Sequence, residues 1–258
     1  MLLKDSGIGL RFYPFGNTSS VGIWLTRDHG KVATRLKGRQ RPNSRLLGQA
    51  DCFYTCELLF YAREHRNVHI LKEATPLDTR DRLRDDWRAC AVASYMAWLV
   101  DRSMPFGPAG PGFYEQLEAG LDRVAAQGAG PAYLLRFEAR WLSLLGALPS
   151  FMQCSRCQRP LAETEKAWLA PDGHGLYCRD CLGTEQSPSA LSFAEISPPV
   201  RQALFALSAE DEPHRSGLPA SVFRATSALL SRLVAVALDL RTPSRERESA
   251  LAIAGRQN

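Results

Sequence analysis

The stretch VGIWLTRDHGKVATRLKGRQRPNSR, residues 21–45, joins two alternating segments, a polar turn and a run of cations. Apolar side chains alternate with other types in residues 21–25 and again in residues 32–36. Period two is typical of a strand with one face in a core and one in water. Asp28-His29-Gly30 predicts the hairpin turn between them. Because Lys31, Arg35 and Lys37 share the other face of the second strand, we expect a basic surface exposed to solvent.

Three further segments extend this hairpin into a set of five strands. Residues 8–12 alternate, residues 52–61 are apolar on both faces except Glu57, and residues 68–73 follow a polar turn. Five short strands in about 70 residues, with a longer connection between the third and fourth, are typical of an OB-type barrel. Such barrels bind single-stranded nucleic acid in a basic groove with aromatic platforms. The candidate aromatic residues are Phe12, Tyr13, Phe15 and Trp24.

After Pro76 the period of the apolar residues becomes helical, and Pro/Gly-rich segments separate the helices. Thr79 is the expected N-cap of the first helix. The predicted helices are Thr79–Arg102, Phe113–Ala126, Tyr133–Leu148, Pro199–Leu207 and Ala220–Leu240. We therefore expect an α+β fold. Its predicted parts are an OB-type barrel (1–76), a helical domain (77–150 and 186–241), a four-cysteine element (151–185) and a flexible tail (242–258).

The chain has 258 residues, 45% of them hydrophobic and 23% charged, as in globular proteins. Its net charge of +5 is uneven: residues 1–75 hold 12 Lys/Arg and 6 Asp/Glu, a balance of +6, and the rest balances at −1. A basic segment beside a neutral remainder favours a polyanion-binding module, although a merely solvated basic surface has the same composition. We expect a cytoplasmic protein, because residues 1–10 lack an apolar signal core and the apolar run 89–100 is too short for a membrane span.

Four cysteines form the sharpest motif of the sequence. Cys154 and Cys157, then Cys178 and Cys181, give two C-x2-C pairs with twenty residues between them. Two such pairs supply four sulfurs for one tetrahedral metal ion, and Zn²⁺ is the usual choice. A site filled by four protein ligands stabilises structure and leaves no position for catalytic water. Disulfides, a redox pair and an iron–sulfur cluster are the alternatives to one structural Zn²⁺.

The remaining cysteines and the histidines suggest no second site. Cys52, Cys56 and Cys90 lie in apolar patterns and are interpreted as core residues, because a nucleophilic Cys90 would need a histidine partner. His174 lies between the cysteine pairs and could replace one ligand. No catalytic triad order, phosphate loop or paired-carboxylate pattern is present.

The order of these parts resembles the bacterial RecO family of recombinational repair proteins. The resemblance lies in LTRDHGK (25–31), KGRQRPNS (37–44), SYMAWLVDR (94–102) and RFEARWLSLLGALPSFMQCSRC (136–157), and it covers most of the chain to about Leu182. The chain departs from the family pattern in two places. Asn17–Ser20 stand where the family usually has an acidic pair, and Gln40 replaces a small residue in the basic run.

The resemblance implies a DNA-binding mediator of recombinational repair and not an enzyme. Family members bind single- and double-stranded DNA, anneal strands, engage the tail of the single-strand-binding protein and work with RecR to load RecA. Cations on the barrel would neutralise phosphates and carry little sequence information. The expected DNA contacts are Arg27, Lys31, Arg35, Lys37, Arg39, Arg41 and Arg45.

Two other functions remain open on sequence alone. The first is a zinc-containing interaction scaffold whose basic barrel binds an acidic protein instead of DNA. The second is a zinc-dependent nucleic-acid enzyme, which a metal site already filled by four cysteines disfavours.

Overall fold

The computed structural model of the chain describes residues 1–63, 68–128, 130–182, 193–209, 218–240 and 244–255. They form two compact units, Met1–Ala129 and Gly130–Gly255, which we call the barrel unit and the helical unit. The barrel unit continues past the predicted OB-type barrel (1–76), because the helix Trp87–Ser103 packs on its first strand.

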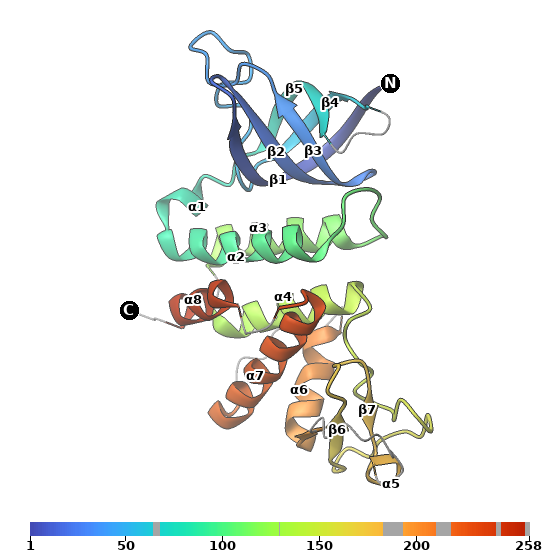
Figure 1. The fold of residues 1–258 in the computed structure, drawn as a ribbon. Helices are drawn as coiled ribbons and strands as arrows, with labels where there is room; N and C mark the ends of the chain where they lie inside the picture. The colour runs from blue at the N-terminus through green and yellow to red at the C-terminus, as the bar shows by residue number, and fades with distance from the viewer. Residues whose placement is uncertain (64–67, 129, 183–192, 210–217, 241–243, 256–258) are drawn as a thin grey trace. The chain divides into compact units, whose positions relative to one another are not determined.

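Five strands form the barrel (Figure 1). They are β1 (Leu2–Phe15), β2 (Ser19–Thr26), β3 (Gly30–Leu36), β4 (Thr55–Tyr61) and β5 (Val68–Asp78). The sheet closes in the order β1-β2-β3-β5-β4, and only the β3–β5 pair is parallel. The predicted OB-type barrel is thereby confirmed. Because β4 begins at Thr55, Cys52 lies before this strand and not within it.

Strands β2 and β3 are more deeply buried than alternation predicts. Trp24, Val32 and Phe60 lie in the barrel core, but the outward-facing residues of β2 are buried as well. Helix α2 packs against β1, and Lys31 exchanges two backbone hydrogen bonds with Gly107 from the segment after that helix. The expectation of a wet face along the length of β3 was therefore wrong: elements of the same unit cover its first half.

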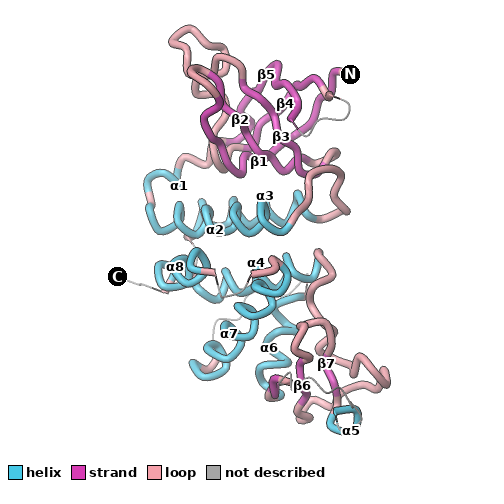
Figure 2. The backbone as a smooth tube through the Cα atoms, viewed as in Figure 1, coloured by secondary structure: helices cyan, strands magenta, loops and turns pink. Residues whose placement is uncertain are grey.

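Residues 79–103 form two helices where one was predicted, α1 (Arg82–Asp85) and α2 (Trp87–Ser103). Asp86 adopts an extended conformation between them, and its carboxylate accepts a hydrogen bond from Arg88 N at 2.9 Å. Asp86 is thus the N-cap of the long helix, in place of Thr79. The α3 helix (Phe113–Gln127) follows the Pro/Gly-rich segment and packs on α2, as Figure 2 shows.

The helical unit contains α4 (Pro131–Leu144), α6 (Pro198–Ser208), α7 (Ala220–Ala237) and α8 (Arg245–Ala254). Helix α4 packs against the other three. A small sheet in the order β7-β6-β8 joins them, formed by β6 (Ala167–Leu169), β7 (Leu176–Tyr177) and β8 (Ala194–Ile196). The short α5 (Arg179–Leu182) follows β7. The expectation of a flexible tail from residue 242 was wrong for residues 245–254, because α8 packs on α4.

One helix of the described chain, α7, is long and apolar enough to cross a membrane by length and composition. Its Leu229, Leu230 and Leu233 are buried, and it packs against α4 and α6. Helix α7 therefore buries one face in the helical unit, while most of its residues stay partly or fully exposed.

Candidate nucleic-acid interface and metal centre

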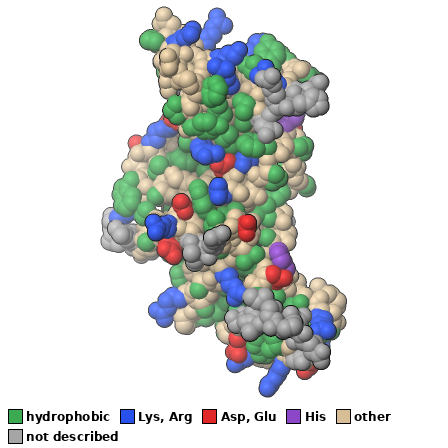
Figure 3. All heavy atoms as spheres, viewed as in Figure 1, with side chains coloured by type: hydrophobic (Ala, Val, Ile, Leu, Met, Phe, Trp, Pro, Cys, Tyr) green, Lys and Arg blue, Asp and Glu red, His purple; other side chains and the backbone are tan. Residues whose placement is uncertain are grey.

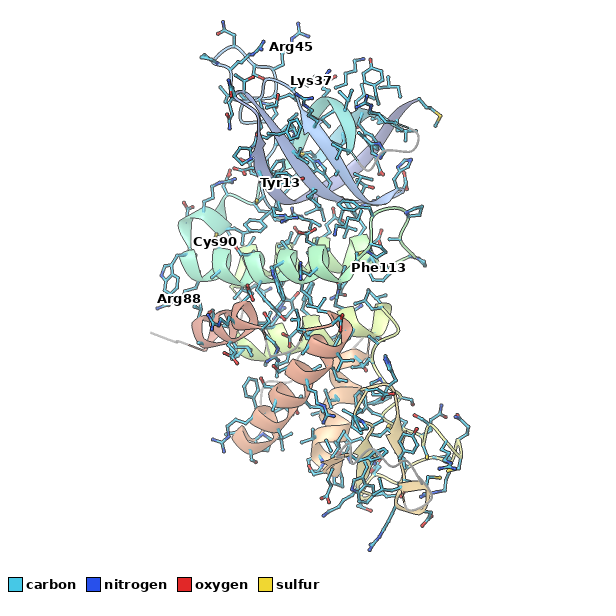
Figure 4. All side chains as sticks on the ribbon, viewed as in Figure 1. Tyr13, Lys37, Arg45, Arg88, Cys90 and Phe113 are labelled. Atoms are coloured by element: carbon cyan, nitrogen blue, oxygen red, sulfur yellow. The ribbon has the colours of Figure 1, made fainter. Side chains whose placement is uncertain are left out.

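The barrel surface at the ends of β1 and β3 carries a group of cations that we call the basic rim: Arg35, Lys37, Arg41 and Arg45. Lys37, Arg41 and Arg45 are exposed and form no ion pair within the described residues. Figure 3 shows Lys and Arg side chains gathered at this end of the barrel unit, and Figure 4 shows Lys37 and Arg45 projecting from it. The rim therefore presents positive charge that no neighbouring carboxylate neutralises.

The loop that carries the rim, residues 37–50, is anchored at several points. Gly38 adopts a positive φ of 65°, which allows the tight turn after β3. Gln40 N donates to Thr18 O at 3.1 Å, and the N–H groups of Arg41 and Ser44 donate to carbonyls three residues earlier, each at 3.0 Å. Leu46 and Ala50 are buried in the barrel core. Cations on such a loop project from a fixed scaffold.

Two aromatic rings of β1 lie exposed, and one of them, Phe15, lies beside the rim. Phe15 is 47% exposed, with the Arg35 guanidinium 4.6 Å from its ring centroid, and Tyr13 is 39% exposed. The other two candidates belong to the core: Trp24 is fully buried, and Phe12 packs edge-on against it at 5.1 Å. Exposed rings next to guanidinium groups are the elements that stack on unpaired bases.

Three of the seven predicted contact residues already have partners within the barrel unit. The Arg39 guanidinium donates to Ala50 O and covers the Phe12 ring at 4.6 Å, so it closes the loop. Arg27 lies at the other end of β2, over the Tyr114 ring and 3.3 Å from a Glu118 oxygen. Lys31 is 5% exposed; its Nζ lies 2.9 Å from Asp101 Oδ1 and also donates to Met104 O. Lys31 is thus a buried structural cation, contrary to the expected exposure.

Replacing Lys31 by methionine is expected to lower the free energy of unfolding by about 1–3 kcal/mol, because a buried charged hydrogen-bond set is lost. The salt dependence of DNA affinity should not change, because Lys31 is buried and lies outside the rim. Urea unfolding and DNA titrations over a salt series measure both quantities, with the exposed Arg82→Met as the control. A variant of unchanged stability that binds DNA weakly would contradict this assignment.

The four predicted cysteine ligands lie together in the helical unit. The Sγ atoms of Cys154, Cys157, Cys178 and Cys181 are all within 4.8 Å of one another, and those of Cys157 and Cys178 are 3.9 Å apart. Tetrahedral Zn²⁺ with bonds of about 2.3 Å would separate its sulfurs by about 3.8 Å. This arrangement can hold one metal ion. His174 is exposed and does not belong to the group.

Backbone hydrogen bonds shape the cysteine cluster and favour its ionisation. Burial acts to raise the pKa of Cys154, but hydrogen bonds from the backbone N–H groups of Cys157, Cys178 and Arg156 outweigh it and lower that pKa to about 6. Burial and the neighbouring sulfurs raise the pKa of Cys181 to about 12. Four thiols so close together lose all their protons only when a cation compensates their charge.

Of the other three cysteines, interpreted as core residues, only Cys56 lies in the core. Cys56 is fully buried, burial raises the pKa of its thiol to about 12, and its Sγ donates to Gln49 O at 3.4 Å. Cys52 is half-buried, and burial raises its pKa too. Cys90 is half-buried on α2. A core thiol of raised pKa is a poor nucleophile.

Long-range ion pairs were missed in the sequence. Glu138 and Arg247 form a bidentate pair, with N–O distances of 2.7 and 2.8 Å, although 109 residues separate them. Arg201 donates to the carbonyls of Phe151 and Ala162 and so ties α6 to the segment next to the cysteine cluster. No local sequence pattern predicts these long-range contacts, because each charged residue has the sequence context of an ordinary surface residue.

Family models of known proteins match residues in both units. The family model described as Recombination protein O N terminal matches residues 1–80, and the one described as Recombination protein O C terminal matches residues 84–246. The chain belongs to the RecO family. It is similar to the DNA repair protein RecO of Moorella thermoacetica, with 30% identity over 70% of this chain and 67% of the relative. RecO of Bacillus subtilis is 28% identical over 70% and 69%, and RecO of Desulforudis audaxviator is 32% identical over 62% of each.

Proposed function

We propose that this RecO-family chain binds single- and double-stranded DNA through the basic rim and promotes the annealing of complementary strands. Annealing requires two phosphate backbones to approach, and a surface of cations offsets their repulsion through counterion release. The protein needs no catalytic group for this activity, and we assign it none. It would act in the bacterial cytoplasm, at the nucleoid during repair.

The observation that supports this proposal most strongly is the free charge of the rim. Lys37, Arg41 and Arg45 stand exposed without ion pairs in the described chain, on a loop held by backbone hydrogen bonds. Arg35 and Phe15 form a stacked pair next to them. Cations contact phosphates and rings contact bases, so the combination suits a single strand better than an acidic protein surface.

The further partners follow from the family. We propose that the chain engages the C-terminal tail of the single-strand-binding protein and cooperates with RecR, so that RecA is loaded on covered DNA. We also propose one structural Zn²⁺ on Cys154, Cys157, Cys178 and Cys181, because four thiolates at tetrahedral spacing are its usual ligands. The ion would hold the segment between the two cysteine pairs and would not take part in DNA chemistry.

Reversal of the rim charges tests the DNA site. The triple variant K37E/R41E/R45E is expected to bind single-stranded DNA about ten- to a hundredfold more weakly at low salt. The slope of log affinity against log salt should fall by about 2, since each lost phosphate contact on a single strand removes about 0.7. Fluorescence anisotropy of labelled oligothymidylate over a salt series measures both quantities.

The matched comparison uses double variants: R41E/R45E reverses two rim charges, and R82E/R102E makes the same change in charge at exposed residues of the same unit outside the rim. Equal losses of affinity in the two double variants would show a general charge effect and not a site at the rim. An acidic peptide that binds the rim, together with a wild type that shows no salt-dependent DNA binding, would favour the scaffold function instead.

A further inference from the structure

The barrel has a second feature outside the rim, a cavity of about 270 Å³ at its opposite mouth. It opens where the β2–β3 hairpin meets the loop between α2 and α3 (Figure 1). The mouth of a β-barrel is a frequent position for small-ligand sites. Four of the lining residues carry aromatic rings: His29, Phe60, His69 and Phe106.

The ring walls of the cavity are held in place by contacts within the barrel unit. His69 stacks on the fully buried Phe60, with ring centroids 5.5 Å apart and planes at 23°, and His29 meets the same ring edge-on at 5.9 Å. Phe106 is 46% exposed, and the Lys31 Nζ lies 4.7 Å from its centroid. Two backbone hydrogen bonds between Lys31 and Gly107, of 2.9 and 3.0 Å, fix the adjoining loop.

The two histidines offer complementary hydrogen-bonding atoms. His69 Nδ1 accepts from Arg63 N at 3.2 Å, so its Nε2 carries the proton and can donate. His29 Nδ1 lies 2.7 Å from Asp5 Oδ2, and this buried carboxylate also accepts from the N–H groups of Asp28 and His29. Nδ1 of His29 is therefore a donor, which leaves Nε2 as an acceptor in the neutral ring. Burial lowers the pKa of His69, which favours its neutral ring.

A planar ligand with both a donor and an acceptor at its edge matches this cavity. Aliphatic ligands would leave the two imidazole nitrogens unpaired, and two histidines alone are a sparse ligand set for a metal ion. A nucleobase has the ring faces, the edge groups and a size below 270 Å³. Arg63 lies next to His69, is exposed and forms no ion pair within the described residues, so it can contact a phosphate.

We propose that the barrel mouth binds one nucleobase of a bound single strand, stacked against Phe106 and hydrogen-bonded by His29 and His69. The proposal rests on the proposed DNA-binding function and adds a second contact point to it. The rim and the mouth lie at opposite ends of β3, whose seven residues span about 20 Å. A strand held at both places would be extended along the barrel, with one base removed from pairing.

The test uses the full-length protein and two probes. The first probe is oligothymidylate with a single 2-aminopurine, whose fluorescence falls when the base stacks on an aromatic ring. The second is deoxyadenosine monophosphate at millimolar concentration, followed through the ring ¹⁵N resonances of the histidines. The variants are His69→Leu and Phe106→Ala, and Leu2→Ala is the control, since Leu2 is exposed and precedes the lining residue Leu3 on β1.

Wild type and Leu2→Ala should quench 2-aminopurine, and the mononucleotide should shift the His29 and His69 resonances. Phe106→Ala and His69→Leu should lose at least half of the quenching and bind the oligonucleotide about fivefold more weakly. Because Phe106 is half exposed, its variant keeps the test valid even if His69→Leu fails to fold. Quenching that persists in Phe106→Ala, or histidine resonances that the mononucleotide does not shift, would overturn the pocket.

The two proposals fail separately in this experiment. If oligonucleotide binding is lost on changing Lys37, Arg41 and Arg45 and is unaffected by the mouth variants, that result supports the proposed DNA-binding function and rejects the base pocket. If the wild type does not bind the oligonucleotide but the mononucleotide still shifts the histidine resonances, the rim is rejected as a DNA site and the pocket is retained.

Discussion

Cys157→Ser is expected to abolish metal binding and to lower the free energy of unfolding of the helical unit by at least about 3 kcal/mol. Structural zinc contributes about 10–16 kcal/mol in small zinc-binding peptides, and three sulfurs with one hydroxyl hold it far more weakly. Cys157 is the sharpest position to change because its side chain is exposed. A serine there creates no cavity, so any loss of stability must come from the metal.

The measurements for this prediction are metal content, thermal unfolding and hydrogen exchange. Wild type should hold about one equivalent of zinc and the variant almost none, with faster exchange across residues 151–182. Cys90→Ser changes a half-buried thiol of the barrel unit and should keep both the zinc and the protection. A metal-free wild type after reducing purification, or a Cys157→Ser protein as stable as wild type, would rule out a structural ion.

DNA binding should not depend on this ion. The cysteine cluster lies in the helical unit and the basic rim in the barrel unit. We therefore expect the rim to keep its salt-dependent affinity in Cys157→Ser at temperatures below its unfolding transition.

The features that were predictable from sequence are those encoded by near neighbours along the chain. Alternation predicted the first three strands, and an apolar run and a polar turn predicted the other two. Asp28-His29-Gly30 predicted the hairpin turn that connects β2 and β3. The spacing of the cysteine pairs predicted their cluster, because two residues between thiols suit one metal ion. In each case the chemistry depends on residues a few positions apart or on a repeated motif.

The predictions that failed depend on distant partners. Lys31 looked like a surface cation because its ion-pair partner, Asp101, is 70 residues away on a helix that covers the strand. Arg247 stands in a stretch of alternating Arg and Glu that is typical of a disordered tail, yet it pairs with a carboxylate on α4. A local pattern shows a charge but not its burial, and burial decides whether the charge binds a ligand or stabilises the fold.

Glu138→Gln removes one charge of the ion pair between Glu138 and Arg247. Glu138 and Arg247 are both buried, at 0% and 2% exposure, so removal of one charge leaves the other unpaired in the core. We expect the free energy of unfolding to fall by about 3–5 kcal/mol, as is usual when one member of a buried pair is removed. Urea unfolding of the full chain, with hydrogen exchange along α4 and α8, measures the loss and locates it.

The control is an ion pair of equal length in the same unit. Lys166 and Glu195 are 2.7 Å apart, like the Glu138 and Arg247 atoms, but about half of each side chain is exposed. Glu195→Gln should cost less than about 1 kcal/mol, because solvent screens an exposed pair. The double variant E138M/R247M should recover most of the stability lost in Glu138→Gln, since it leaves no buried charge without a partner. Equal losses for Glu138→Gln and Glu195→Gln would show that α8 does not depend on this pair for its place against α4.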